Sequence, residues 1–366
     1  MSEWKECQLG DLITFQRGHD LPKTKMQGGK YPVVGSNGII GYHNEYTTEA
    51  PSITIGRSGN VGKPFLFKGR SWSHNTSLYI KEYKAVDPIF IYYFLQTLDL
   101  GNYAGGSAVP TLNRNHIHTL NVYVPTNIEE QRRIGAVLSV IDDKIELNTA
   151  INENLEQQAY LLLEQMLSIP HDDVCCLSDI ANINPRYTLS KRTEARYIDM
   201  SQLSTTTSFP DGWTFRAYNG GMKFKNKDTI MARITPCLEN GKTAYIDFLE
   251  GEEIAFGSTE YIVLSPKDNI PPELLYCIVR YPEFRTYATI NMNGSSGRQR
   301  VSGEIIGKYE IPSFTQEELS KFGAVAEPLF KQITENSLQN RNLAALRDTL
   351  LPKLMNGEID VSAVKI

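Results

Sequence analysis

Two regions of the chain contain short glycine-rich loops whose polar side chains could read the edges of nucleic-acid bases. Examples are Arg57–Asn60 in the first region and Asn293–Arg300 in the second. Arginine matches the guanine edge, asparagine and glutamine match the adenine edge, and glycine lets the backbone approach phosphate. Such loops are also common as solvated turns, so each one is a weak indication alone. The candidate DNA-contacting residues are Ser36, Asn37, Arg57, Ser58, Asn60, Lys63, His74, Asn75, Asn113, Arg114, Arg233, Thr235, Lys242, Ser258, Thr259, Ser295, Ser296, Arg298, Gln299 and Arg300.

Motifs that would supply catalysis are absent or incomplete. The sequence has no GxxxxGK[ST] phosphate loop, no glycine-rich turn suited to S-adenosylmethionine and no nuclease-like PD…(D/E)xK pattern. Asp87–Phe90 and Asn184–Tyr187 resemble the [DN]PP[YF] motif that holds a flipped base in adenine methyltransferases, but both lack the second proline. We interpret Asp87–Pro88 as a helix start. The chain is therefore expected to be non-enzymatic and to hold no cofactor.

The cysteines and histidines do not form a metal-binding or disulfide pattern. Five cysteines occur without a CxxC pair, and six histidines occur without HxxxH or HExxH spacing. We expect buried free thiols and no metal site. His116 and His118 would share a face if they lay on a strand, which could suit a metal, but a loop or a DNA contact fits equally well.

Length and charge predict a protein with two cores and an uneven surface. The chain has 366 residues, of which 41% are hydrophobic and 22% are charged. Residues 1–126 carry a net charge of +3 (12 basic, 9 acidic), whereas residues 127–170 carry −5 (3 basic, 8 acidic). This distribution permits DNA binding with a partner's help in phosphate contacts. We find neither a signal peptide nor an apolar run of about 18–20 residues, so a cytoplasmic location is expected.

The chain contains an internal repeat with a constant offset of 188 residues over about forty positions. It pairs Glu129–Glu130 with Glu317–Glu318, Gly135–Val137 with Gly323–Val325, Asn148 with Asn336, Asn152 with Asn340, and Leu162–Leu163 with Leu350–Leu351. Weaker matches upstream, such as Arg57 with Arg233, drift in offset. Two divergent modules, each followed by a near-duplicate segment, indicate two different recognition modules on one shared scaffold. We call the scaffold formed by the two repeated segments the frame.

The repeated segments have the heptad pattern of long helices. From position 134 to 166, steps of four and three residues select mostly apolar side chains, and the second copy repeats this pattern from 322 to 354. The acidic pair Glu129–Glu130 follows Thr126, as in a capping box. The expected central seam consists of Ile141, Ile145, Asn148, Asn152 and Leu155 in the first copy and Leu329, Ile333, Asn336, Asn340 and Leu343 in the second.

Two asparagines at matching seam positions favour packing of the helices on each other. A buried asparagine needs a polar partner, so Asn–Asn pairing would fix the register of an antiparallel intramolecular coiled coil with pseudo-two-fold symmetry. Forty helical residues would extend about 60 Å. Pro328 is expected to kink or split the second helix. An ordinary dimerisation bundle without DNA would explain the helices equally well.

The variable modules read as mixed α+β domains. Tyr31–Gly35, Ser52–Gly56 and Glu260–Leu264 have the apolar, β-branched character of strands, and helices are expected near residues 88–98 and 272–281. We therefore divide the chain into a first recognition module (1–126), a first helical region (127–170), a second module (171–312) and a second helical region (313–366).

With this order, the chain resembles the specificity subunits of Type I restriction enzymes over essentially its whole length. The resemblance is carried by Trp4 with Leu9–Asp11, by Tyr31–Gly38, by the helix entrance Pro125–Ile134 and by the tail Leu350–Ile359. The second helix entrance departs from the pattern, because Ser320–Phe322 stands where the first copy has Arg132–Ile134. This leaves open whether both helices hold a partner equally well.

The resemblance implies two target recognition domains that read the two halves of a split, asymmetric double-stranded DNA target. It further implies that the helical regions dock two DNA adenine methyltransferase subunits, which motor-nuclease subunits then join. S-adenosylmethionine, ATP and Mg would be bound by those partners. Two other readings remain: a two-headed scaffold that binds no nucleic acid, and the DNA-binding remnant of a fused methyltransferase–nuclease.

Overall fold

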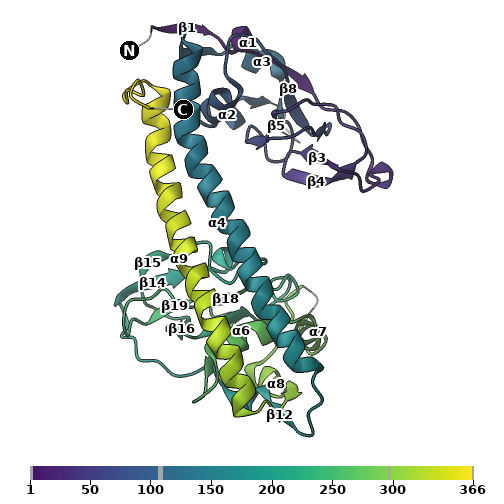
Figure 1. Ribbon diagram of the computed structural model, residues 1–366, viewed down its shortest axis with the longest axis vertical. Coiled ribbons are helices and arrows are strands. Elements are labelled where there is room, and N and C mark those ends of the chain that lie inside the picture. The colour runs from purple at the N-terminus through teal and green to yellow at the C-terminus, as the bar shows by residue number, and fades with distance from the viewer. Residues whose placement is uncertain (1–2, 106–109, 296, 365–366) are drawn as a thin grey trace. The chain divides into compact units, whose positions relative to one another are not determined.

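The computed structural model describes residues 3–105, 110–295 and 297–364. It divides into two compact units, one formed by Met1–Lys144 with Asn342–Ile366 and the other by Ile145–Arg341 (Figure 1). The first unit therefore combines the N-terminal module with the C-terminal end of the chain, whereas the second is one continuous stretch. Within the described residues, no helix has the length and apolar character needed to cross a membrane.

The first unit contains a mixed α+β module. Its elements are β1 (Trp4–Gln8), α1 (Leu9–Leu12), β2 (Ile13–Arg17), β3 (Tyr31–Gly35), β4 (Gly38–His43), β5 (Ser52–Gly56), β6 (Pro64–Phe67), β7 (Trp72–Ser73), β8 (Ser77–Tyr83), α2 (Pro88–Gln96), β9 (Ala104–Gly105), β10 (Thr111–Leu112), α3 (Arg114–His118) and β11 (Asn121–Pro125), with short 3-10 turns at Lys23–Lys25 and Leu100–Tyr103. The main sheet has the order β2-β8-β5-β6, and a smaller one has the order β4-β3-β7. Strand β1 pairs with β11, and β9 pairs with β10.

The second unit contains a module of the same class. Its elements are β12 (Val174–Cys176), α5 (Leu177–Ile180), β13 (Ala181–Ile183), β14 (Glu194–Ile198), β15 (Thr214–Ala217), β16 (Met222–Phe224), β17 (Thr229–Ala232), β18 (Thr243–Tyr245), β19 (Ala255–Gly257), β20 (Tyr261–Pro266), α6 (Pro272–Arg280), α7 (Pro282–Ile290), α8 (Gly303–Gly307) and β21 (Glu310–Pro312), with a 3-10 turn at Met200–Gln202. Its sheets have the orders β13-β20-β17-β18 and β15-β14-β19-β16, and β12 pairs with β21.

The two modules share one topology. In both main sheets the central antiparallel strands, β8 and β5 in one and β20 and β17 in the other, are flanked by the same neighbours in chain order. The other sheet of each module, three-stranded in the first and four-stranded in the second, contains one parallel pair, β3 with β7 and β14 with β19. The internal repeat thus extends from the helices to the modules, although the module sequences have diverged.

The central strands β5 and β17 are buried on both faces, so their polar side chains Ser52, Thr54 and Thr229 are buried together with the apolar ones. Every residue of β5 and of β17 is buried, as expected for strands covered on both sides. Helix α2 covers the first sheet and begins at Pro88, where the Asp87 carboxylate accepts hydrogen bonds from the backbone N–H groups of Ile89 and Phe90 at 2.9 and 3.0 Å. The interpretation of Asp87–Pro88 as a helix start is confirmed.

Two long helices follow the modules, α4 (Ile128–Ser168) and α9 (Gln316–Met355). Asn127 caps α4, because its side chain accepts a hydrogen bond from Glu129 N–H at 2.9 Å, while the Thr126 hydroxyl donates to the Glu3 carbonyl instead. The expectation that Thr126 begins the helix was therefore wrong by one residue. At α9, Thr315 and Glu318 form a reciprocal capping box, with Thr315 N–H donating to the Glu318 carboxylate at 2.7 Å.

Helix α9 runs unbroken from Gln316 to Met355, so Pro328 does not split it. Proline removes one backbone hydrogen bond, the one that would reach residue 324. Apolar packing on both sides of this position holds the helix together, since Ala326 and Phe330 are both buried in the core of the second unit. The expected split was wrong, and the alternative of a kink at Pro328 stays a prediction.

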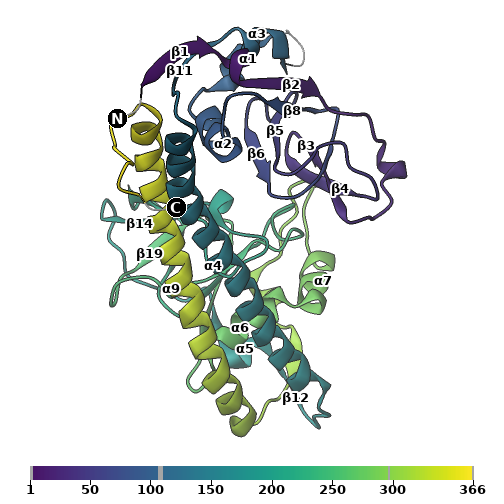
Figure 2. The ribbon, with the colours of Figure 1, turned by 45° about the horizontal axis from the view of Figure 1, so that its top comes forward.

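Glycines at equivalent heptad positions let each module lie against a long helix. A Cβ added at Gly135 would lie 3.1 Å from the Phe90 backbone nitrogen, and one at Gly323 would lie 3.1 Å from Pro271 Cγ. Figure 2 shows α2 against the first turns of α4. The repeated Gly–Ala–Val sequence therefore marks the point where α2 and α6 begin beside the frame.

Within the second unit, asparagines join α4 to α9 in a symmetric network. Asn148 donates to Asn340 Oδ1 at 2.8 Å, and Asn336 donates to Asn152 Oδ1 at 2.8 Å. The repeat offset of 188 exchanges these two contacts with each other. Two further pairs of contacts obey the same exchange: Asn152 donates to Ser337 Oγ and the Ile333 carbonyl, and Asn340 donates to Thr149 Oγ1 and the Ile145 carbonyl. Asn148 departs from it, because it also donates to Gln339 Oε1 at 2.7 Å and the equivalent position, Ile151, has no polar side chain.

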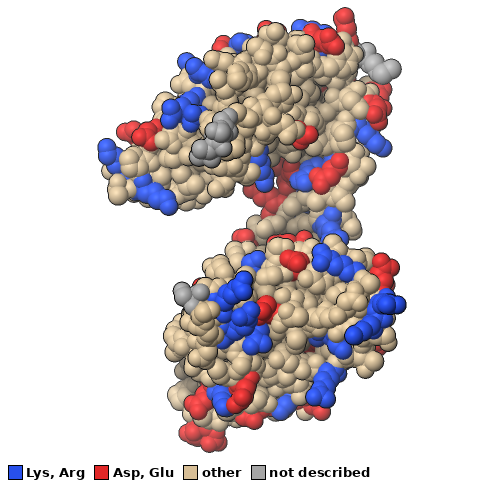
Figure 3. Space-filling view, turned by 180° about the vertical axis from the view of Figure 1, so that it is seen from behind, with Lys and Arg blue, Asp and Glu red and all other residues tan. Residues whose placement is uncertain are grey.

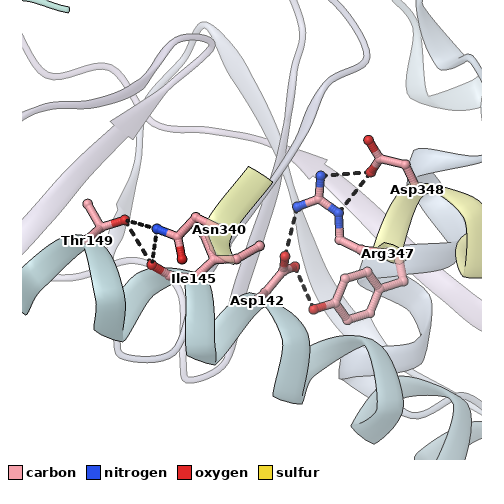
Figure 4. Close-up of polar contacts among 7 residues, drawn as sticks. Asp142, Ile145, Thr149, Asn340, Arg347 and Asp348 are labelled. Atoms are coloured by element: carbon pink, nitrogen blue, oxygen red, sulfur yellow. Dashed lines mark hydrogen bonds and ion pairs between the residues drawn. The ribbon is translucent and has the colours of Figure 1, made fainter. Parts of the chain in front are cut away.

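This exchange defines an antiparallel coiled coil with pseudo-two-fold symmetry, as expected for the fold. Asn148 contacts Asn340, and Asn152, four residues later on α4, contacts Asn336, four residues earlier on α9, so the two helices run in opposite directions. Within the first unit, the same helices meet at an ion pair, in which Arg347 Nη1 lies 2.8 Å from Asp142 Oδ1 (Figure 4). Tyr93 of α2 donates to the other oxygen of Asp142 at 2.7 Å. The module is thereby tied to both helices.

All five cysteines are free thiols, but only Cys277 is fully buried. The expectation of buried thiols was therefore right for one residue, and the other four are half-buried. Among the described residues, no group of three His, Cys, Asp or Glu side chains is placed to hold a metal ion.

Candidate DNA interface

In the first module, the polar loops at the end of β5 converge on one residue, Thr76. Its carbonyl accepts hydrogen bonds from the N–H groups of Arg57 and Ser58 at 2.8 and 3.2 Å. Its hydroxyl lies 3.3 Å from the Ser36 backbone nitrogen and 3.1 Å from His74 Nδ1. Four candidate contact residues from three separate loops are thus brought together around a threonine that is not itself among the candidates.

Beside these loops lies a pocket of about 540 Å³ with a basic lining. Arg57, Asn113 and Arg114 contribute to it, together with Arg17 and His116, which are not among the candidates. The backbone fixes this arrangement, because Leu112 N–H donates to the Arg57 carbonyl at 2.9 Å and Ser58 forms a β-bridge with Thr111. The Asn113 carboxamide oxygen is occupied as the cap of α3, accepting from Asn115 N–H at 3.0 Å.

The electrostatics of this pocket favour an anion. Arg17 and Arg57 line the same pocket, and burial together with the neighbouring Arg17 cation lowers the pKa of Arg57. None of the three arginines in the lining forms an ion pair with another described residue. Such an arrangement is stabilised when a negative group enters.

The two histidines of α3 have different environments. Both lie on a short helix and not on a strand, so they do not share a face. His118 Nε2 accepts a hydrogen bond from the Phe15 backbone N–H at 2.9 Å, and burial lowers the pKa of His118. It is a neutral structural residue, whereas His116 faces the pocket.

The other candidates of the first module are more dispersed. Asn75 donates to the Asp20 carboxylate. The Lys63 ammonium lies over the Phe65 ring, 5.8 Å from its centroid, and lines a different pocket with Gly62 and Asp99. Asn37 and Asn60 are exposed.

In the second module, the polar loops also meet at the end of the central strand. Arg233 follows β17 as Arg57 follows β5, and the Arg233 carbonyl accepts from Val301 N–H at 3.0 Å. Thr235 donates to the Gln299 carbonyl through both N–H and hydroxyl, at 3.1 and 3.2 Å. Ile234 and Arg300 form a β-bridge. The two modules therefore use one backbone plan to bring an early and a late loop together.

The charges at this place differ from those of the first module. Arg300 forms three hydrogen bonds of 2.7–3.0 Å with the Glu260 carboxylate, and these hold the pKa of Glu260 below its usual range. Arg233 Nε is buried without a hydrogen-bond partner among the residues that the structure describes. The candidate Arg300 is therefore bound to the carboxylate of Glu260 within the module. Glu260 itself is not among the candidates.

The remaining candidates of the second module fall into two groups. Ser258 accepts a hydrogen bond from Glu260 N–H at 3.1 Å, and Lys242 donates to the Met200 carbonyl at 2.8 Å, so both have internal partners. Thr259, Ser295 and Arg298 are exposed, and Gln299 is half-buried. Ser296 lies outside the described residues. Figure 3 shows groups of Lys and Arg side chains on the visible face of the second unit, in the lower part of the view.

Arg17 and Glu260 carry signals that sequence reasoning could have used. Arg17 begins the run Arg17-Gly18-His19-Asp20, and Gly18 is required because an added Cβ would lie 2.0 Å from the His74 carbonyl oxygen. Glu260 follows the polar pair Ser258–Thr259. The spacing of His116 and His118 already allows a DNA contact, but neither residue is in the candidate set.

Comparison with known proteins places this arrangement in one family. The family model of the Type I restriction modification DNA specificity domain matches residues 1–157 and 173–322, so it covers both modules in tandem. The HindI specificity subunit of a Type I restriction enzyme from Haemophilus influenzae is 22% identical over 331 residues, covering 68% of this chain and 71% of that protein. The MjaIX specificity subunit from Methanocaldococcus jannaschii is 24% identical over 307 residues, covering 74% of this chain and 69% of that protein.

The fold agrees with a solved structure of the same class. The crystal structure of a Type I restriction–modification S subunit from M. genitalium matches with a TM-score of 0.65 and 18% identity, covering 96% of both chains. The tandem modules, the pseudo-symmetric helices and the family match over most of the length agree with one another. The chain belongs to the family of Type I restriction–modification DNA specificity subunits.

Proposed function

We propose that this specificity subunit reads a bipartite, asymmetric target in double-stranded DNA and directs adenine methylation and restriction by partner subunits. Each module would read one half of the target. The subunit is the non-catalytic member of the complex. S-adenosylmethionine, ATP and Mg would be bound by two DNA adenine methyltransferase subunits and by motor-nuclease subunits.

The observation that carries this proposal is the exchange of hydrogen bonds between Asn148–Asn340 and Asn152–Asn336. It relates the two helices by a pseudo-two-fold axis. DNA has local two-fold symmetry of its own, and dimeric readers use this to bind half-sites on one duplex. Here the loops at equivalent places differ, with Arg57 beside Arg17 in one module and Arg233 beside Glu260–Arg300 in the other. Two different half-sites follow.

The experiment is co-expression of the chain with any adenine methyltransferase that a neighbouring gene encodes, in a host without adenine methylation, followed by genome-wide mapping of methylated adenine. A split motif with a fixed gap, present only when this chain is expressed, is expected. An unsplit motif would contradict two-module reading. If no adenine is modified and no methyltransferase co-purifies, a scaffold without nucleic acid becomes the better explanation.

A further inference from the structure

We propose that the pocket formed by Arg17 and Arg57 in the first module holds a phosphate group of the DNA strand, and that Arg17 is a DNA ligand. This rests on the proposed function and specifies the chemistry of one of its sites. The pocket would fix the position of the first module on the duplex, while neighbouring side chains read the bases.

The lining of the pocket supports a phosphate. Its side chains include three arginines and His116, and no carboxylate is among the described residues that form it. Guanidinium groups bind phosphate through paired N–H donors, and they do so most strongly where water is partly excluded. The apolar residues Leu78 and Leu112 supply such walls.

The positions of the two arginines also support a shared ligand. Arg17 ends β2 and Arg57 directly follows β5, and both strands flank β8 in the main sheet. Arg17 pairs with Leu78 on β8, and Leu78 pairs on its other side with Ile55 of β5, two residues before Arg57. Both arginines therefore lie beside the same end of β8. The effect of Arg17 on the pKa of Arg57 reflects this proximity. Because no carboxylate of the described residues lines this pocket, a negative group supplied from outside can bind both arginines.

The equivalent place in the second module provides the contrast. There Arg300 is neutralised by the Glu260 carboxylate, so the module fills its own anion position. The Arg17–Arg57 pair has no such internal partner among the described residues. The first module is therefore expected to depend more strongly on salt than the second.

The test measures how the affinity of the full-length chain for a duplex of about 30 base pairs depends on salt. Each phosphate contact contributes a slope of about −0.9 in log K against log salt concentration. Arg17→Gln and Arg57→Gln should each make the slope shallower by about 1, and because both hold one phosphate, the double variant should lose little more. Binding to target and non-target duplexes should weaken by the same factor. Arg57→Lys should restore most of the slope, because it keeps the charge.

The matched control is Lys5→Gln, which removes one exposed cation from β1, outside this pocket. It should leave the slope nearly unchanged, which separates a local contact from a general loss of charge. The proposal is overturned if the arginine variants keep the wild-type slope, or if they relax the methylated motif at one base pair, since that outcome indicates base reading. If the wild-type chain binds no duplex, either alone or together with its methyltransferase subunits, the proposed function is refuted instead.

Discussion

Asn152 and Asn336 show how a few polar groups can fix the register of a helical frame. Asn152 is only 5% exposed and uses its amide for three contacts, including the bond that it accepts from Asn336. In an apolar seam, a shift of one heptad would leave these groups without partners. The cost of unpaired buried amides therefore selects a single register.

Replacing Asn152 by Ala should lower the free energy of unfolding by about 1–3 kcal/mol, because the Asn336 amide then remains buried without its acceptor. The double variant Asn152→Leu/Asn336→Leu should lose less free energy of unfolding than the sum of the losses in the single variants Asn152→Leu and Asn336→Leu. Urea unfolding of these three leucine variants measures the coupling. Strictly additive losses would mean that the pair does not act as a unit.

Asp228 is a buried carboxylate with an unusual titration. It is fully buried, accepts hydrogen bonds from Tyr187 Oη at 3.0 Å and Lys225 N–H at 2.9 Å, and burial raises the pKa of Asp228 to about 6. A raised pKa in the folded state means that the stability contributed by this group is fully present below the unfolded value and is lost as pH rises through about 6. The second module should therefore lose some stability between mildly acidic and neutral pH.

Asp228→Asn should remove this pH dependence. The amide oxygen can still accept from Lys225 N–H, and the amide nitrogen can donate to Tyr187, so the change should be tolerated above pH 7. The rise of the Asp228 pKa from 3.8 to about 6 corresponds to about 3 kcal/mol at most. The readout is the free energy of unfolding at several pH values from 4 to 8. Parallel curves for the variant and the wild type would show that another group controls this range.

At the scale of elements, the heptad seam and the strands were predictable because each has a strict period. Tyr31–Gly35 and Ser52–Gly56 form strands with the predicted bounds, and the asparagine positions follow from the 188-residue offset. The meeting of Arg17 with Arg57, and of Glu260 with Arg300, could not be predicted, since it depends on sheet order across forty residues or more. The helical position of His116 and His118 was missed because Asn113 was interpreted as a contact residue and not as the cap of α3.

Pro328 offers a test of how the frame tolerates a missing hydrogen bond. It is exposed within an unbroken helix, between the buried residues Ala326 and Phe330. Pro328→Ala restores the backbone donor and should raise the free energy of unfolding by up to about 3 kcal/mol. Thermal unfolding followed by circular dichroism measures the shift. An unchanged or lower melting temperature would show that the helix has already adapted to the proline.

At the scale of the whole molecule, the proposed function makes the length of the helices a determinant of the gap between half-sites. Inserting one heptad after Lys144 in α4 and another after Arg341 in α9 keeps the seam in phase and adds about 10 Å of helix, or about three base pairs. The methylated motif should retain both half-sites with a longer gap. The same seven residues placed after Gly251, in an exposed turn, are the control and should leave the gap unchanged. An unaltered gap in the helix variant would exclude the helices as the determinant.

The discontinuous make-up of the first unit has a consequence for synthesis of the chain. Its core includes Leu354, Met355 and Val361, and the Trp4 ring lies against Gly357. The second unit needs only residues 145–341, so it can be completed on the ribosome while the first still waits for its last segment. Domains usually mature in the order of translation. Here the module that is synthesised first completes its core last. A chain interrupted after residue 341 would therefore contain a complete second module and a first module with an incomplete core.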